Sequence, residues 1–101
     1  MSKMEKEIEA ALRKMVSKHG GKCLKWVCPG WSGVPDRIIL LPGGRIVFAE
    51  VKRPTGGEMS TLQEWWGEQL SLLGFWCVVI QSMEDIHWLE LIIQSEKGSR
   101  L

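Results

Sequence analysis

The chain has 101 residues, 45% of them hydrophobic and 25% charged, with a formal net charge of +1. This length is typical of one domain, and so large an apolar fraction excludes a disordered chain. A membrane-spanning helix is excluded as well, because the longest nonpolar run covers only residues 72–80 whereas a span needs about 20 residues, and the charged start Met1–Glu5 predicts no secretory signal.

The first half of the sequence predicts one helix followed by three strands. The helix is expected over residues 3–18, because Ser2 and Glu5 have capping-box spacing and two glycines follow at positions 20 and 21. Strands are expected over 22–28, 37–41 and 45–52, with Pro42-Gly43-Gly44 joining the last two into a hairpin. The residues of the helix predicted to point inward are Met4, Ile8, Ala11, Leu12, Met15 and Val16.

The second half predicts a helix over 61–73, a strand over 75–80 and a last helix from Ser82 to about Gln94. The strand is apolar throughout, which is typical of a buried central position, and the polar residues from 95 onward are expected to fray. The inward residues of the two helices are predicted to be Leu62, Trp66, Leu70, Leu73, Met83, Ile86, Leu89 and Ile93. The resulting order α-β-β-β-α-β-α predicts an α/β fold, a mixed sheet flanked by helices, in a single domain over 1–101 with a polar tail at about 95–101.

The cysteines bear on the cellular compartment. Cys23, Cys28 and Cys77 are odd in number and form no C-x-x-C pair. This pattern favours a reducing cytosol over a disulfide framework. We therefore expect a cytoplasmic protein (in the host cytoplasm if it is viral) whose cysteines are small core residues.

The charges are distributed unevenly along the chain. Residues 1–53 hold eleven Lys/Arg and five Asp/Glu, a net of +6, and residues 54–101 hold two Lys/Arg and seven Asp/Glu, a net of −5. A basic half beside an acidic half indicates a one-sided surface for a polyanion. The alternative is a set of solvated faces whose charges segregate without a binding role.

Two carboxylates are predicted to face each other at the open end of the hairpin. If Leu41 lies opposite Arg45, the register places Asp36 opposite Glu50, with Cβ atoms about 5 Å apart. Like charges so close are held by a cation or by a shared proton. Lys52 follows Glu50 by two residues, so its side chain leaves the same face of the strand.

This cluster of oxygen ligands suits Mg²⁺ or Mn²⁺, and a neighbouring ammonium can hold a phosphate oxygen or orient a water. The alternative is a surface salt bridge of Glu50 or Asp36 with Lys52 or Arg37. The hairpin favours the functional interpretation, because it begins with Pro-Asp and brings the second carboxylate opposite the first.

These motifs resemble the VRR-NUC domain of the PD-(D/E)XK nuclease superfamily. The resemblance rests on the segment Gly33-Val34-Pro35-Asp36-Arg37, on Glu50-Val51-Lys52 about thirteen residues later, and on an acidic residue in the first helix. It extends from about residue 5 to residue 81. It implies a restriction-endonuclease-like fold and a metal-dependent endonuclease that hydrolyses phosphodiester bonds in DNA.

The resemblance also implies residue roles. Asp36 and Glu50 would bind the metal together with the backbone carbonyl of Val51, and Lys52 would activate or position the attacking water. Gln63 would organise the lysine or the scissile phosphate, which completes the candidate catalytic residues. The residues Ser60 to Gln63 also form an S-x-x-Q capping box, in which the glutamine merely closes a helix end.

The family's helix glutamate corresponds to Glu7, or else to Glu5 or Glu9. We predict Glu7, because its spacing from Met4 and Ala11 places it at the edge of the inward stripe, with the other two further toward solvent. The alternative for Glu7 is a solvated charge on the helix surface.

Four further residues are candidates for contacts with nucleic acid. Lys25, Arg37 and Arg53 could bind phosphates around the site, or be ordinary solvated charges. Trp31 lies in a Gly/Pro loop, where its ring could wedge against bases or lock the loop.

The resemblance to stand-alone viral and phage members implies structure-selective cleavage of branched DNA, with four-way (Holliday) junctions as the expected substrate. Paired cuts need two sites, so a homodimer is expected, without a membrane or an organic cofactor. The alternatives are a non-catalytic nucleic-acid-binding or scaffold domain on the same fold, or an exonuclease or nickase.

Overall fold

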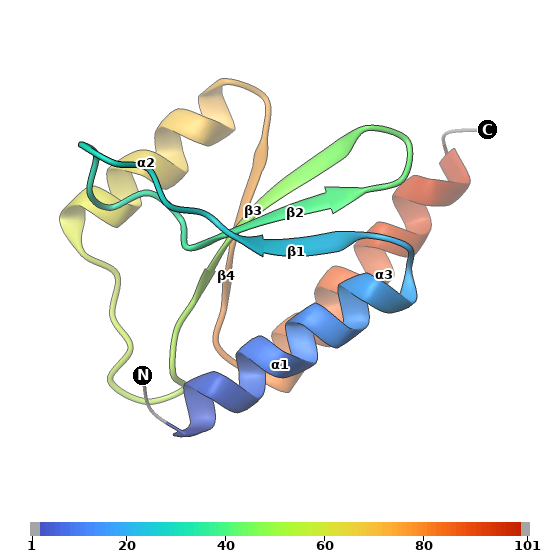
Figure 1. Ribbon diagram of the computed structural model, residues 1–101, viewed down its shortest axis with the longest axis horizontal. Coiled ribbons are helices and arrows are strands. Elements are labelled where there is room, and N and C mark those ends of the chain that lie inside the picture. Colours follow the sequence, from blue (N-terminus) through green and yellow to red (C-terminus); the bar gives the residue numbers. More distant parts are fainter. Residues whose placement is uncertain (1–2, 100–101) are drawn as a thin grey trace.

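The structure, a computed structural model, describes residues 3–99 (Figure 1). Three helices and four strands follow one another in the predicted order α-β-β-β-α-β-α, which confirms the α/β class. These elements are α1 (Lys3–Lys18), β1 (Lys22–Lys25), β2 (Arg37–Leu41), β3 (Arg45–Val51), α2 (Thr61–Leu72), β4 (Trp76–Ile80) and α3 (Met83–Ser99). None of the helices in this described part is long and apolar enough to cross a membrane.

Two predicted boundaries are wrong. β1 ends at Lys25 rather than at residue 28, because the chain leaves the sheet after one more backbone bond, from Trp26 N–H to Asp36 C=O at 2.8 Å. α3 continues to Ser99 instead of fraying from residue 95, since no proline interrupts it and its late Gln, Glu and Lys residues favour a helix. The predicted N-cap Ser2 lies outside the described residues.

The four strands form one mixed sheet in the order β1-β2-β3-β4. The first three are antiparallel and β4 runs parallel to β3. In the hairpin Leu41 pairs with Arg45 and Ile38 with Phe48, which confirms the predicted register. The Pro42–Gly44 turn therefore controls which residues meet at the far end of the hairpin.

The prediction that residues 75–80 form a central strand is wrong. β4 pairs with β3 alone and is an edge of the sheet, and both Trp76 and Val79 are exposed. Its apolar composition has another cause: α2 and α3 both contact β4. A strand whose faces are covered by helices has a continuous apolar sequence even when no second strand pairs with its outer edge.

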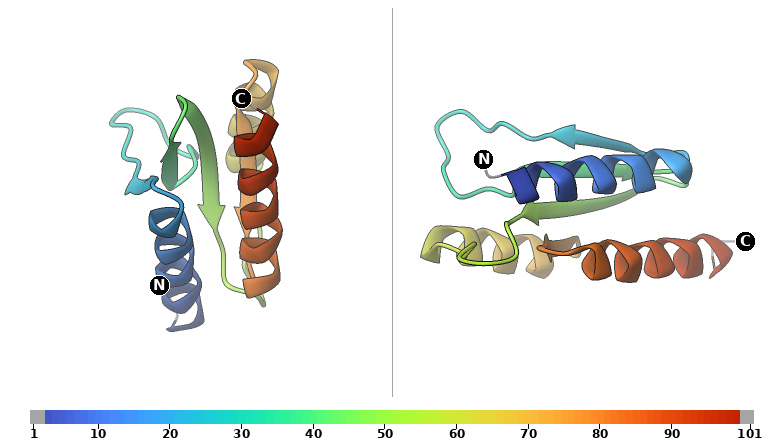
Figure 2. Two further views of the ribbon diagram at one scale, coloured as in Figure 1. Left: turned by 90° about the vertical axis from the view of Figure 1, so that its right-hand side faces the viewer. Right: turned by 90° about the horizontal axis from the view of Figure 1, so that it is seen from below.

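The helices lie on opposite faces of the sheet. α1 and α3 contact each other below the sheet in the view of Figure 1, while α2 lies above it, and Figure 2 shows the same arrangement from two sides. The main core fills the α1/α3 face and consists of Ile8, Leu12, Met15, Val16, Ile39, Leu41, Val47, Ala49, Val51, Ile80, Ile86, Leu89 and Ile93. The opposite face holds Phe48, whose ring centroid lies 4.9 Å from that of Trp26 and 5.4 Å from that of Phe75.

Four side chains predicted to point inward are exposed. They are Met4, Leu62, Leu73 and Met83. Among the strands, α2 contacts chiefly β4. The buried stripe of α2 is therefore narrow, and Leu70 is the one buried residue of this helix. Met4 and Met83 stand in the first turns of α1 and α3, at the ends of their buried stripes.

Candidate active site

The hairpin register brings Asp36 and Glu50 to facing positions. The pairs Ile38↔Phe48 and Arg37↔Ala49 continue by one step to these two carboxylates. The Oδ1 of Asp36 accepts a hydrogen bond from the Val51 N–H at 3.2 Å, which holds its carboxylate against the end of β3. Asp36 and Glu50 thus lie opposite each other at the end of the hairpin that is farthest from its turn.

Glu50 is the buried acidic residue among those whose burial the structure describes, with a side chain only 7% exposed. Its Oε1 accepts a hydrogen bond from Gln63 Nε2 at 2.8 Å and lies 3.6 Å from Lys52 Nζ. Its Oε2 is buried and has no hydrogen-bond partner among the described residues. A buried carboxylate oxygen left without a partner costs about 1–3 kcal/mol or more, so this atom is suited to a positively charged ligand.

The surroundings of both carboxylates make their ionisation costly. Burial first, and then the nearby Asp36 charge, raise the pKa of Glu50 from 4.5 to about 7, although Lys52 acts in the opposite direction. Burial likewise raises the pKa of Asp36, against the lowering effects of the Val51 N–H and Arg37. A divalent cation between such groups would remove the penalty that both pKa shifts report.

Lys52 and Gln63 surround Glu50 from two different elements. Lys52 follows the last residue of β3, where its N–H donates to Ile80 C=O at 2.9 Å, and its side chain is only 16% exposed. Gln63 caps α2, since its Oε1 accepts from Ser60 N–H at 2.9 Å while its Nε2 binds Glu50. The capping role of Gln63 is therefore confirmed, and the same side chain joins the helix cap to Glu50. Its role in organising Lys52 or the scissile phosphate stays a prediction.

The predicted orientation of the helix glutamates is wrong. Glu7 is exposed, whereas Glu5 and Glu9 are half-buried, and both of these contribute to the raised pKa of Asp36. The reason is helical geometry: at about 100° per residue, Glu5 lies three residues before the buried Ile8 and on its face. The prediction for Glu7 relied on Met4 as an inward residue, and that side chain is exposed.

Arg37 is buried inside the protein and does not fit the predicted contact with phosphates. Its Nη2 lies 2.6 Å from Glu9 Oε1, which ties β2 to α1. This ion pair was not predicted from the sequence. The available signal was the alternation of the strand, which places Arg37 on the same face as the core residues Ile39 and Leu41.

The remaining basic candidates are distributed differently. Lys25 is exposed at the end of β1, beside Arg37 in the sheet register. Arg53 donates from Nε to Thr55 C=O at 2.9 Å and from Nη2 to Gly56 C=O at 3.1 Å, so it orders the loop after β3. Arg45 is buried and donates to Ile93 C=O at 3.0 Å. Several cations of the basic half thus bind protein atoms, and two of them, Arg37 and Arg45, are buried.

The donor set fits a hard cation that keeps part of its water shell. In the part of the chain that the structure describes, no group of three or more His, Cys, Asp and Glu side chains is placed to hold a metal ion. Asp36 and Glu50 supply two carboxylates, and Mg²⁺ in enzymes is commonly held by one or two carboxylates plus substrate phosphate and water. The unpartnered Oε2 of Glu50 is the specific observation in favour of such a cation.

Trp31 lies in the loop between β1 and β2 and is 62% exposed. Its ring meets that of Trp66 edge-on, with centroids 5.8 Å apart. The contact links the loop to α2, as expected for a ring that locks the loop, while most of the Trp31 surface stays open.

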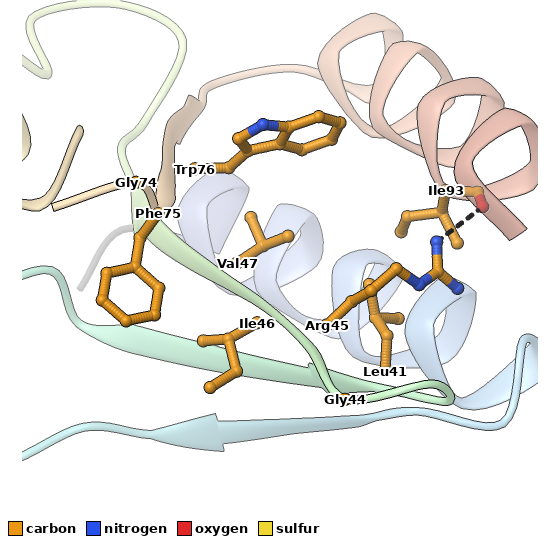
Figure 3. Close-up of a pocket in the computed structure, with 9 residues that line it drawn as sticks. All are labelled: Leu41, Gly44, Arg45, Ile46, Val47, Gly74, Phe75, Trp76 and Ile93. Carbon is orange, nitrogen blue, oxygen red and sulfur yellow. Dashed lines mark hydrogen bonds between the residues drawn. The ribbon is translucent and has the colours of Figure 1, made fainter. Parts of the chain in front are cut away.

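A separate pocket of about 260 Å³ is lined by none of the residues of the carboxylate cluster (Figure 3). It is bounded by the hairpin turn, by Trp76 and by the Ile93 region of α3, and Arg45 crosses it to reach the Ile93 carbonyl. Arg45 begins β3 and Glu50 stands near its end, so the two sites are separated by roughly 17 Å of strand. This pocket is not part of the carboxylate cluster.

Comparisons with known proteins agree with this geometry. No family model matches the sequence. The chain is 42% identical over 83 residues to a protein described as "Putative nuclease p44" from Acyrthosiphon pisum secondary endosymbiont phage 1, an alignment that covers 79% of this chain and 85% of that protein. The fold is similar to a solved structure described as a "VRR_NUC domain", with a TM-score of 0.82 and 26% identity over 87% of this chain and 95% of the other.

Proposed function

Because the chain belongs to the VRR-NUC family of nucleases, we propose that it is a divalent-metal-dependent endonuclease that hydrolyses phosphodiester bonds in branched DNA. One observation carries the proposal. Glu50 is a buried carboxylate beside Asp36, and its Oε2 has no partner among the described residues. A site of this kind gains most from a cation, and Mg²⁺ or Mn²⁺ matches its oxygen donors.

Each residue of the site has a part in the hydrolysis. Asp36 and Glu50, with the Val51 carbonyl, would hold the cation. When bound, that cation would supply positive charge beside the scissile phosphate and lower the pKa of a nearby water. Lys52 places an ammonium next to Glu50, where it can hold a non-bridging phosphate oxygen or orient the water that attacks phosphorus. When the water attacks, a new P–O bond forms and the water gives up a proton to solvent. The bond to the leaving sugar oxygen breaks, and that oxygen takes up a proton from solvent.

Gln63 acts as a positioning residue in this scheme. Its Nε2 holds Glu50 Oε1, which leaves Oε2 as the oxygen directed to the cation. We assign the helix glutamate of the family to Glu5, because it shares a face with Ile8 and acts on Asp36. Glu9 is committed to Arg37 and serves the fold.

A homodimer would place two such sites on one branched DNA. The surface we assign to the second copy is the β4-edge surface, defined by the exposed residues Leu72, Trp76, Trp88 and Leu91. Among residues 3–99, β4 has no strand neighbour on its outer side, and an apolar groove runs between Trp76 and Trp88. An exposed apolar edge strand is a template for pairing with another chain. Light scattering should give about twice the protomer mass of 11.5 kDa; a mass near 11.5 kDa would refute the dimer.

A cleavage panel tests the proposed function. Single-stranded, duplex, flap and four-way-junction DNA are each incubated with Mg²⁺, with Mn²⁺ or with EDTA, using wild-type protein and Glu50→Gln as the matched control. We expect internal cuts in the branched substrates with either metal, and none in EDTA or with the variant. Cleavage in EDTA would contradict the metal role. Binding without cleavage in every condition would favour a non-catalytic DNA-binding domain, and release of mononucleotides would indicate an exonuclease.

A further inference from the structure

We propose that a tryptophan-lined groove beside the carboxylates binds unpaired nucleobases of the DNA next to the scissile phosphate. This inference rests on the proposed nuclease function and specifies the substrate: DNA whose nucleotides are unpaired or splayed where the cut is made. The groove, called here the Trp31 groove, has a volume of about 570 Å³ and is lined by Gly30, Trp31, Ser32, Thr61, Leu62, Trp65 and Trp66.

Three indole rings form the groove, and two of them remain open. Trp66 stands between the others, with centroids 5.8 Å from Trp31 and 5.1 Å from Trp65. Both contacts are edge-on, at 87° and 81° between ring planes, so neither outer ring is covered by a parallel neighbour. Trp31 is 62% and Trp65 46% exposed. Open ring faces of this kind are what a nucleobase stacks on.

The groove is held rigid by contacts between the loop and α2. The Trp66 indole N–H donates to Ser32 C=O at 3.1 Å. Gly33 has φ +84°, and a Cβ at that position would lie 2.6 Å from Leu62 Cγ, so only glycine lets the loop approach the helix this closely. A platform that is already ordered loses little entropy when a base binds.

The groove and the carboxylate cluster are built from adjacent residues of the chain. Leu62 lines the groove, and the next residue, Gln63, hydrogen-bonds to Glu50. From the other side, the loop that carries Trp31 and Ser32 leads directly to Asp36. Neighbouring Cα atoms are about 3.8 Å apart, so the first turn of α2 contributes both to the groove and to the carboxylate cluster.

The lining also separates base from phosphate. The lining residues that the structure describes carry no charge, and Ser32 and Thr61 add hydroxyl groups to the indoles. A neutral aromatic groove suits a base, whereas the phosphate belongs with Lys52. Bases inside a duplex have both faces covered by their neighbours, so only unpaired or splayed nucleotides can occupy the rings.

Fluorescence anisotropy in Ca²⁺, which prevents cutting, tests the inference. The full chain is titrated against a labelled blunt duplex and the same duplex with a short thymidine overhang. We expect about tenfold tighter binding of the overhang DNA. Trp31→Leu should remove most of this preference, Trp31→Phe should retain it, and Leu40→Ala, which removes an exposed apolar side chain of β2 near the hairpin turn, should leave it unchanged. Affinity for the blunt duplex should stay the same throughout.

A second measurement uses wild-type protein alone, so the inference stays testable if a variant fails to fold. A 2-aminopurine in the overhang should lose fluorescence on binding, because stacking on indole quenches it. Equal affinity for the two DNAs together with unquenched 2-aminopurine would overturn the inference. A change from dimer to monomer in Trp31→Leu with the overhang preference intact would instead assign the groove to a second copy. Failure of the nuclease proposal appears separately, as no cleavage in Mg²⁺ or Mn²⁺ with the overhang preference retained.

Discussion

Gln63 donates a hydrogen bond from Nε2 to Glu50 Oε1 at 2.8 Å, while its Oε1 accepts the N–H of Ser60 at 2.9 Å. One side chain thus closes the N-terminus of α2 and fixes one oxygen of the buried carboxylate. The Ser60 hydroxyl completes the capping box by accepting from Gln63 N–H at 3.1 Å. Helix start and site geometry are therefore coupled, and the two roles can be separated by substitution.

The substitution Gln63→Glu separates the capping role of this side chain from its contact with Glu50. Glutamate keeps the capping oxygen but loses the amide donor and places a negative charge against Glu50. We expect cleavage to fall by at least about tenfold with little loss of helix content. The matched control is Ser60→Ala, which costs about 1 kcal/mol of stability through the lost cap and should leave the cleavage rate of the folded protein nearly unchanged. Equal rates for Gln63→Glu and wild type would show that the glutamine is only a cap.

Glu50 makes the metal-free protein less stable as pH rises. Its folded pKa of about 7 lies above the ordinary value of 4.5, so its contribution is fully present below pH 4.5 and is lost as pH rises through about 7, by up to about 3 kcal/mol. Asp36 acts with the same sign. Urea unfolding in EDTA from pH 4 to 8 should show Glu50→Gln gaining stability relative to wild type as pH increases. A difference that does not change with pH would contradict this environment for Glu50.

Lys52→Ala should impair turnover more than metal binding, because an ammonium cannot ligate a cation. Its Nζ lies 3.6 Å from Glu50 Oε1. Calorimetric titration with Mn²⁺ should give an affinity within a few-fold of wild type, while cleavage falls by about a hundredfold or more. If Mn²⁺ affinity is lost as completely as in Asp36→Asn, the assigned division of roles is wrong.

The three glutamates of α1 should respond differently to replacement by glutamine. We expect Glu5→Gln to reduce cleavage strongly and Glu7→Gln to have almost no effect, because Glu7 is exposed. Glu9→Gln should cost on the order of 1–3 kcal/mol of stability, since it leaves the buried Arg37 guanidinium without its ionic partner. Cleavage rates and urea unfolding of the three variants distinguish these outcomes. A severe loss of cleavage in Glu7→Gln alone would restore the assignment made from sequence.

The features that depend on local geometry were predicted correctly from the sequence. The Pro42–Gly44 turn determines the register of the hairpin, and the register places Asp36 opposite Glu50 by counting. The capping box at Ser60 was likewise visible from spacing alone. In both cases the residues that matter lie close together in the chain.

The features that depend on packing between elements distant in the chain could not be predicted from the sequence. An apolar run does not show whether a strand is central or at an edge, because helices on its two faces give the same pattern, as they do for β4. The Arg37–Glu9 ion pair depends on how α1 crosses β2, and the rotation of α1 was misjudged by counting Met4 as buried. The second contact of Gln63, to Glu50, depends on where α2 sits on the sheet.

The most direct measurement is the single-turnover rate of four-way-junction cleavage in Mn²⁺ by wild type, Asp36→Asn and Glu50→Gln, each with its Mn²⁺ affinity determined by calorimetry. Each substitution removes one charge at the proposed cation site and keeps the size of the side chain. The account predicts that both variants fold, bind Mn²⁺ far more weakly and leave the junction uncut. Cleavage near the wild-type rate by both variants would contradict it.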